Sequence, residues 1–287
     1  MKAKKIKLFC IIMLAIIFAG VIFMLINNYC ISTTYSVNKN KNIQNNVRLV
    51  LLSDLHGKSF GKGNKNLVKA VLAQKPDIIL LAGDMYDEKC DTEAVNSLIS
   101  GMREGCRHIY YSFGNHESNH EDKREIMEKT AKNAGAVVLN NAVETIEIKG
   151  NTLHIYGIEI PMYYYSGYIR GTDELMYSLT GEKIEELIGK STDETDILIA
   201  HNPIHLPGYA EWGADIVVSG HNHGGTVRLP FYGAVASPNG DRGNIHYDCG
   251  EYKIGDCTMY LSRGLGEWLG PVRVFNLPEL YVIDLVG

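Results

Sequence analysis

The chain has 287 residues, 45% of them hydrophobic and 21% charged, which is enough apolar material for a sizeable core and excludes global disorder. Its length allows either two small domains or one large domain. With 28 Lys and Arg against 33 Asp and Glu, the net charge is −5, so we expect no nucleic-acid partner.

The N-terminus is basic and is followed by a long apolar segment. Residues 1–53 contain no acidic side chain, and residues 1–7 include Lys2, Lys4, Lys5 and Lys7. Residues 8–26 form 19 consecutive positions without a charge or an amide. As a helix this segment would be about 29 Å long, close to the roughly 30 Å of a bilayer core. It therefore predicts one transmembrane helix.

This helix is interpreted as an uncleaved signal anchor. A cleavable signal peptide would have an apolar stretch of about 7 to 15 residues before small residues, whereas Asn27, Asn28 and Tyr29 follow here. A buried core helix is the alternative, but it would need a polar face. The lysines predict a cytoplasmic N-terminus, with the rest of the chain on the extracytoplasmic side of the cell membrane. Later proteolytic release stays open.

The next segment, residues 27–46, is rich in Asn and has no apolar periodicity. It predicts a flexible tether that would span on the order of 25 Å as a random coil, which would keep the following domain near the lipid surface. The six cysteines include no CxxC pair, and the sequence names no disulfide.

The soluble part begins with alternating strands and helices. Strands are expected at 47–52, 77–81 and 107–113, and helices with one apolar face at 64–74 and 92–103. This alternation predicts βαβ units in a largely parallel sheet. Each strand ends in a polar cluster, and ligands in such sheets bind at the carboxyl ends of the strands.

The remainder is richer in strands. After a helix at 118–133, strands are expected at 136–139, 143–148 and 153–158, and two more, at 196–200 and 215–219, end in polar clusters. Strands at 252–254, 258–262, 272–275 and 280–285 are expected to form a second sheet. The resulting prediction is one α/β domain over residues 47–287, with two sheets flanked by helices.

Five strand ends carry side chains that bind metals. They are Asp54 with His56, Asp84, Asn115 with His116, His201, and His221 with His223. Singly, each could be a turn, packing or surface residue. In Asp-x-His and His-x-His, however, two side chains lie on the same side of an extended segment, so each pair can close on one ion. Imidazole together with carboxylate suits zinc, iron or manganese.

The motifs resemble those of the calcineurin-like metallophosphoesterases. Their pattern D-x-H, G-D, G-N-H-[DE], H and G-H-x-H appears in order, from Asp54 to His223, over a resemblance that covers about residues 47–286. It implies a four-layer αββα sandwich of two mixed sheets and a dinuclear metal centre. Asp54, His56 and His223 would hold the first metal, Asn115, His201 and His221 the second, and Asp84 would bridge them. His116 would be the catalytic acid, which binds no metal.

The resemblance also implies an activity. Two divalent ions can hold a hydroxide that attacks phosphorus directly, and His116 could protonate the leaving oxygen. The tail, including Arg263, is similar to the membrane-associated bacterial branch related to UDP-diacylglucosamine hydrolases. We therefore expect a membrane-tethered phosphoesterase acting on phosphodiester or pyrophosphate bonds of lipid-linked or envelope molecules. A phosphomonoesterase, a protein phosphatase and a non-catalytic metal-binding scaffold are the alternatives, and the oligomeric state stays open.

A tyrosine cluster lies between the expected strands. Tyr163, Tyr164, Tyr165 and Tyr168, followed by Arg170, occupy a glycine-containing loop. These side chains could form the lip of the site and meet lipid or a sugar, or they could simply cover a sheet. His108, His120, His154, His205 and His246 are interpreted as packing or surface residues.

Overall fold

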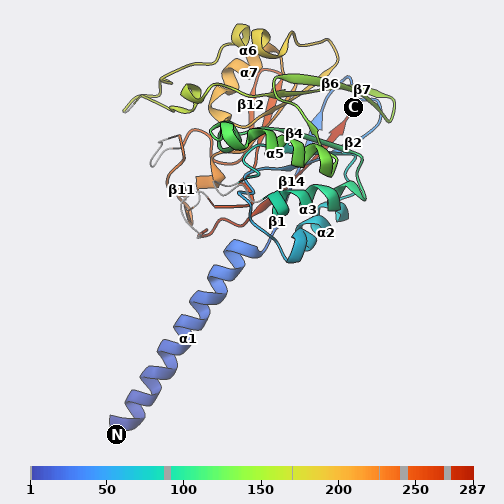
Figure 1. Ribbon diagram of the computed structural model, residues 1–287. Coiled ribbons are helices and arrows are strands. Elements are labelled where there is room, and N and C mark those ends of the chain that lie inside the picture. The colour runs from blue at the N-terminus through green and yellow to red at the C-terminus, as the bar shows by residue number, and fades with distance from the viewer. Residues whose placement is uncertain (1, 87–91, 170, 226, 240–244, 268–272) are drawn as a thin grey trace.

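Two six-stranded mixed sheets lie face to face in the computed structural model, which describes residues 2–86, 92–169, 171–225, 227–239, 245–267 and 273–287 (Figure 1). The first sheet has the strand order β1-β14-β2-β3-β4-β5 and the second β12-β13-β9-β8-β7-β6. In chain order, the strands of the first sheet are β1 (Ser32–Lys39), β2 (Val47–Leu52), β3 (Ile78–Ala82), β4 (His108–Ser112), β5 (Val137–Val138) and β14 (Glu279–Val286). Those of the second are β6 (Ala142–Ile148), β7 (Asn151–Ile158), β8 (Thr195–Ala200), β9 (Ile216–Ser219), β12 (Gly250–Ile254) and β13 (Cys257–Leu261).

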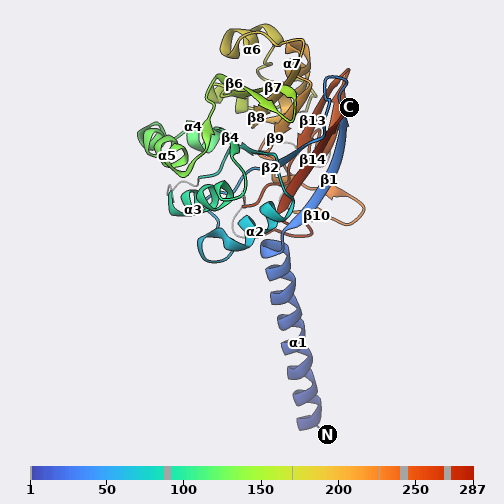
Figure 2. The ribbon, with the colours of Figure 1, turned by 90° about the vertical axis from the view of Figure 1, so that its right-hand side faces the viewer.

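Helices cover the outer face of each sheet (Figure 2). The first sheet carries α2 (Lys65–Ala73), α3 (Thr92–Arg103) and α5 (Glu121–Ala134), and the second carries α6 (Gly181–Ile188) and α7 (Leu206–Trp212). Among the described residues, the remaining elements are the short helix α4 (Asn115–Ser118), four 3₁₀ turns, and the hairpin of β10 (Arg228–Leu229) and β11 (Gly233–Ala234). This arrangement confirms the predicted four-layer sandwich.

Both faces of the central strands are buried, which explains their continuous apolar sequences. In β2, Val50 and Leu52 pack under the helices, whereas Leu49 and Leu51 face the second sheet. All four side chains are fully buried. Because successive side chains alternate between the two faces, one strand serves two layers of core. The parallel register of β2, β3 and β4 brings their carboxyl ends to one edge of the first sheet. In the same way, the register of β8 and β9 brings their carboxyl ends to one edge of the second sheet.

The helix α1 (Lys2–Tyr29) projects away from the two sheets in both views (Figures 1 and 2). Within it, Ile6–Tyr29 reaches a mean hydropathy of 3.1 in its most apolar window, none of which is buried in the protein. Leu14 and Phe18, for example, have exposed fractions of 66% and 67%. Such a surface is costly in water, so the helix has the length and the composition to cross a bilayer.

The prediction of a flexible tether over residues 27–46 is wrong. The first three of these residues belong to α1, and β1 pairs in parallel with β14 along eight positions, from Ser32 opposite Glu279 to Lys39 opposite Val286. Because β1 is an edge strand, its side chains are largely polar and partly exposed, as with Tyr35 at 60%. Because its side chains are mostly polar, this strand has no apolar periodicity in the sequence.

The expected grouping of the C-terminal strands also needs correction. Strand β14 lies in the first sheet, between β1 and β2, and only β12 and β13 join the second. Of the strand expected at 272–275, residue 272 lies outside the described residues, and Val274 makes a single bridge with Val227. Cys10, Cys30, Cys106, Cys249 and Cys257 are all free thiols, and Cys90 lies outside the described part of the chain.

Candidate metal centre

The loops that follow β2, β3, β4, β8 and β9 converge where the two sheets meet, and they bring the predicted side chains together. Backbone hydrogen bonds hold the loops side by side: Asp54 N donates to Gly83 O at 3.0 Å, His56 N to Asp84 O at 3.0 Å, and Gly220 N to His201 O at 3.1 Å. Each predicted residue thus lies just past a strand end, as the motif spacing indicated.

The backbone is strained at this centre. Five of the seven predicted ligands have a positive φ: Asp54 (52°), His56 (48°), Asp84 (53°), His221 (72°) and His223 (50°). Residues other than glycine adopt this left-handed conformation rarely, at a cost of order 1 to 3 kcal/mol each. Such strain concentrates where a side chain must be aimed at a ligand, so these outliers indicate a functional site.

The first group of ligands is Asp54, His56 and His223, whose donor atoms all lie within 4.8 Å of one another. His223 Nε2 lies 3.4 Å from Asp54 Oδ1 and 3.1 Å from His56 Nε2. Asp54 and His223 are almost completely buried, with 0% and 1% of their surface exposed. Three donors from two loops, those after β2 and β9, therefore face one small volume.

The second group, Asp84, His201 and His221, has the same compactness. His201 Nδ1 lies 2.7 Å from the carbonyl oxygen of Ala82, so this nitrogen carries the hydrogen and Nε2 is left to face Asp84 Oδ2 at 3.0 Å. His221 Nε2 lies 3.2 Å from Asn239 Oδ1. Such contacts to the second nitrogen orient imidazole ligands in metal sites.

Asp84 lies between the two groups. Its Oδ2 is 3.0 Å from His201 Nε2 and 3.9 Å from His56 Nε2, while its Oδ1 accepts a hydrogen bond from His116 N at 2.9 Å. His116 belongs to a third compact group with His56 and Asp84, and its ring stands edge-on to that of His56 with centroids 4.5 Å apart. The single carboxylate of Asp84 thus has ligands of both groups around it.

The donor set fits divalent cations. Asp54 Oδ2, Asn115 Oδ1, His201 Nε2 and His223 Nδ1 are buried and have no hydrogen-bond partner among the described residues. Buried carboxylates and imidazole nitrogens left without partners cost several kcal/mol. A cation in each group would satisfy these atoms. Nitrogen and oxygen donors in this proportion suit Zn²⁺, Mn²⁺ or Fe²⁺.

Burial sets the protonation states of the imidazoles. It lowers the pKa of His56 to about 4 and that of His221 to about 3, which keeps both rings neutral and able to bind a cation. Burial would also lower the pKa of His201, but Asp84 and Asp54 raise it to about 10. Without a metal, a proton on His201 thus supplies part of the positive charge that the carboxylates require.

Two glycines of the motifs allow the carboxylates to approach the backbone closely. A Cβ at Gly114 would lie 2.3 Å from Asp84 Oδ1, and one at Gly220 would lie 2.4 Å from Asp54 Oδ2. No side chain fits at either distance. The motifs G-N-H and G-H-x-H therefore have glycine at these positions because the carboxylates of Asp84 and Asp54 leave no room for a side chain.

The role of Glu117 was not anticipated, although it ends the G-N-H-[DE] motif. It is fully buried and accepts hydrogen bonds from four backbone N–H groups, of Asp84, Met85, Tyr86 and Gly114, and from the hydroxyl of Tyr111. Burial and the nearby Asp84 raise its pKa, and the hydrogen bonds oppose this shift. Glu117 thus fixes the loop that presents Asp84.

We expect the substitution Glu117→Ala to lower the free energy of unfolding by about 3 to 5 kcal/mol, because several buried donors lose their acceptor together. Urea unfolding of the detergent-solubilised chain, followed by fluorescence, measures the change. Glu125→Ala is the control, because Glu125 is exposed on α5 and its loss should cost less than about 0.5 kcal/mol. A loss below 1 kcal/mol for Glu117→Ala would contradict this role.

One tyrosine of the cluster lies at the edge of the metal centre, and another packs in the core. The ring of Tyr165 lies 5.2 Å from that of His221, at the edge of the centre, whereas Tyr164 is buried against His205. Tyr168 stacks on His246, and Arg170 lies outside the described residues. His205 Nε2 contacts the carbonyl oxygen of Tyr164 at 3.0 Å, which agrees with its interpretation as a packing residue.

Comparisons with known proteins agree with this centre. The model of the family described as calcineurin-like phosphoesterase matches residues 47–225. A Campylobacter jejuni protein described as an uncharacterized metallophosphoesterase is 27% identical over 86% of this chain and 61% of its own length. Phosphodiesterase YaeI of Escherichia coli is 25% identical over 83% of this chain and 82% of its own. A Danio rerio transmembrane protein with a metallophosphoesterase domain is 26% identical over 84% of this chain and 53% of its own.

Proposed function

The chain belongs to the calcineurin-like phosphoesterase family, and from that premise we propose that it is a membrane-tethered hydrolase of phosphodiester or pyrophosphate bonds that works with two divalent metal ions. Family membership and the relatives identify a metal-dependent phosphoester hydrolase. The choice of diester is supported by the similarity to a phosphodiesterase.

One observation carries the proposal of two ions. Two separate groups of three donors meet at Asp84, whose Oδ2 faces His201 from one group and His56 from the other. We assign Asp54, His56 and His223 to one ion, and Asn115, His201 and His221 to the other, with Asp84 shared. When bound, two such ions would activate water and neutralise phosphoryl oxygens.

The protein side chains hold and orient the reacting groups. Glu117 and the backbone contacts of Asp54 and Asp84 keep the ligands in place, so little reorganisation is needed during the reaction. The backbone N–H of His116 donates a hydrogen bond to Asp84 Oδ1, and this contact places the imidazole of His116 beside the ligands. The His116 side chain is only partly buried. From there it can give a proton to the leaving oxygen, a contribution of about 10² to 10⁴ in rate.

We propose that α1 anchors the enzyme with residues 1–7 in the cytoplasm and the hydrolase domain on the extracytoplasmic side. The basic N-terminal residues support this orientation. The similarity to a transmembrane protein supports membrane attachment. A domain held there would meet lipid-linked or envelope molecules, so we propose a substrate of that kind.

Metal removal tests the proposed function. We expect EDTA to abolish hydrolysis of bis-p-nitrophenyl phosphate and Mn²⁺ or Zn²⁺ to restore it, because the reaction depends on the bound ions. Metal at a hundred times its dissociation constant should also raise the free energy of unfolding, by about 2.7 kcal/mol for each ion bound. Metal binding without turnover would indicate the scaffold alternative. A preference for p-nitrophenyl phosphate would indicate a monoesterase.

A further inference from the structure

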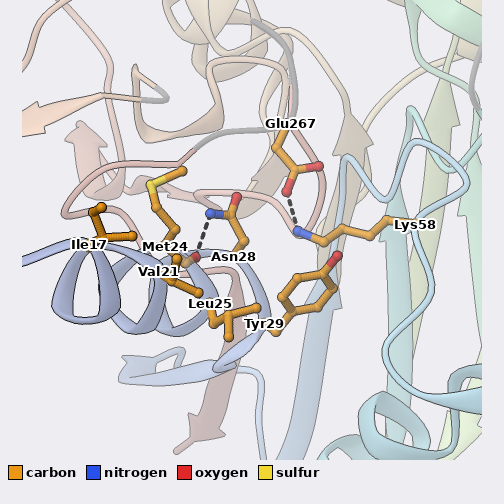
Figure 3. A pocket seen from close by; sticks show the side chains of 9 residues that line it. Ile17, Val21, Met24, Leu25, Asn28, Tyr29, Lys58 and Glu267 are labelled. Carbon is orange, nitrogen blue, oxygen red and sulfur yellow. Dashed lines mark hydrogen bonds and ion pairs between the residues drawn. The ribbon is translucent and has the colours of Figure 1, made fainter. Parts of the chain in front are cut away.

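A cavity of about 480 Å³ lies between α1 and the hydrolase domain (Figure 3). One side is the apolar face of α1 formed by Ile17, Gly20, Val21, Met24 and Leu25, and the other side is polar, with Lys58 and Glu267 from the domain. This volume is within the range of ligand-binding pockets, about 300 to 1,000 Å³. The cavity therefore joins a membrane-type surface to the domain.

The cavity is held open by a fixed junction. Asn28 Oδ1 accepts a hydrogen bond from Arg273 N at 2.9 Å, Asn27 Oδ1 accepts one from Asn276 N at 3.3 Å, and the rings of Phe23 and Phe275 contact each other at 5.0 Å. Arg273 is fully buried, although it carries a charge. These contacts fix the last turns of α1 against the domain.

The polar side of the cavity adjoins the loop that carries Asp54 and His56. Lys58 comes two residues after His56. Glu267 follows Gly266, and the backbone N–H of Gly266 donates a hydrogen bond to the carbonyl oxygen of Asp54 at 2.5 Å. The two segments are packed so closely that a Cβ at Gly266 would lie 2.5 Å from the carbonyl oxygen of Leu55. A molecule that occupies the cavity thus lies beside the segment that carries two of the predicted ligands.

We propose that this cavity holds an acyl chain of a membrane phospholipid while its phosphodiester lies at the metal-ligand residues. The apolar wall belongs to a helix that can cross a bilayer, so the cavity opens toward lipid. The ion pair of Lys58 and Glu267 is largely buried, with exposed fractions of 10% and 17%, and Tyr29 lies beside it, 5.2 Å from Lys58 Nζ. A tyrosine and a neutral ion pair suit the polar boundary of a bilayer.

Gly20 offers a way to fill the cavity. A Cβ at this position meets no atom within 4 Å, so the larger side chain of Gly20→Phe enters open space. Ala19→Phe is the matched control, because Ala19 is exposed and does not line the cavity. If Gly20→Phe fails to insert into membranes, Val21→Trp provides a second way to fill the same space.

Binding is measured on metal-free protein in nanodiscs that contain phosphatidylglycerol with a diazirine in the first half of one acyl chain. We expect photolabelling of peptides that contain Lys58 and Glu267, reduced about tenfold by Gly20→Phe and unchanged by Ala19→Phe, which corresponds to 1.4 kcal/mol of binding. Labelling that is equal in both variants overturns the proposal. Crosslinks between two copies of the chain at α1 would show that a second helix occupies the cavity, and would also overturn it.

The inference rests on the proposed function, and kinetics separate the two. With metal present, Gly20→Phe should raise the KM for phosphatidylglycerol about tenfold and leave the KM for bis-p-nitrophenyl phosphate unchanged. If pocket labelling is found but neither ester is hydrolysed, the lipid site stands and the proposed function fails. If the soluble ester is hydrolysed but the pocket is not labelled, the function stands and the lipid site fails.

Discussion

Replacing Asp84 by Asn is expected to remove both bound metal and turnover. The substitution keeps the shape and an oxygen that can accept the hydrogen bond from His116 N, but it removes the buried charge that faces both ligand groups. We expect kcat/KM to fall on the order of a thousandfold or more, because the ions and their stabilisation of the transition state are lost together.

Metal content per chain, measured by mass spectrometry, and kcat/KM for bis-p-nitrophenyl phosphate check this expectation. Asp122→Asn is the control, because Asp122 is exposed on α5 and belongs to none of the ligand groups. A full complement of two ions in the Asp84→Asn protein would contradict the assignment of Asp84 as the shared ligand.

For His116→Asn we expect turnover to fall without loss of metal: both ions are retained and kcat falls by about 10² to 10⁴. His116 is the one member of the ligand groups to which we assign a proton rather than an ion. Its donor atom lies close enough to His56 and Asp84 to bind a metal, so the metal content decides between the two roles.

The leaving group provides a sharper test of His116. A diester of an alkyl alcohol needs a proton on its leaving oxygen and should lose the most activity, whereas bis-p-nitrophenyl phosphate should lose less. His120→Asn is the control, because His120 is the N-cap residue before α5 and belongs to none of the ligand groups. Loss of an ion in the His116 variant, or equal losses for both esters, would contradict its role as an acid.

That the proposed ligands lie close together could be predicted from the sequence, because the signals that place them are local. Each lies at the end of a short apolar strand, and parallel strands must bring their carboxyl ends together. The two-sheet fold followed from the same strands. The left-handed backbone at Asp54 and Asp84, by contrast, has no composition signal, and only the structure shows it.

Other features could not be predicted because they depend on distant partners. Strand β1 is polar and forms only because β14, whose residues lie 247 positions later, as with Ser32 opposite Glu279, offers it an open edge. Arg273 and Asn239 lie in loops, where no periodicity marks a residue that is buried or that orients a ligand. Glu117 belonged to the motif, but its five hydrogen bonds become visible only when the loops after β3 and β4 are side by side.

Between the end of α1 at Tyr29 and the start of β1 at Ser32 there are only Cys30 and Ile31. Two residues span about 7 Å at most, so the catalytic domain cannot swing far from its helix. With α1 in the bilayer and a lipid as the substrate, as we propose, an enzyme held in this way would search for substrate by lateral diffusion within one leaflet. Its encounter rate would then follow the surface density of the lipid and the fluidity of the bilayer, rather than the concentration of a solute in bulk water.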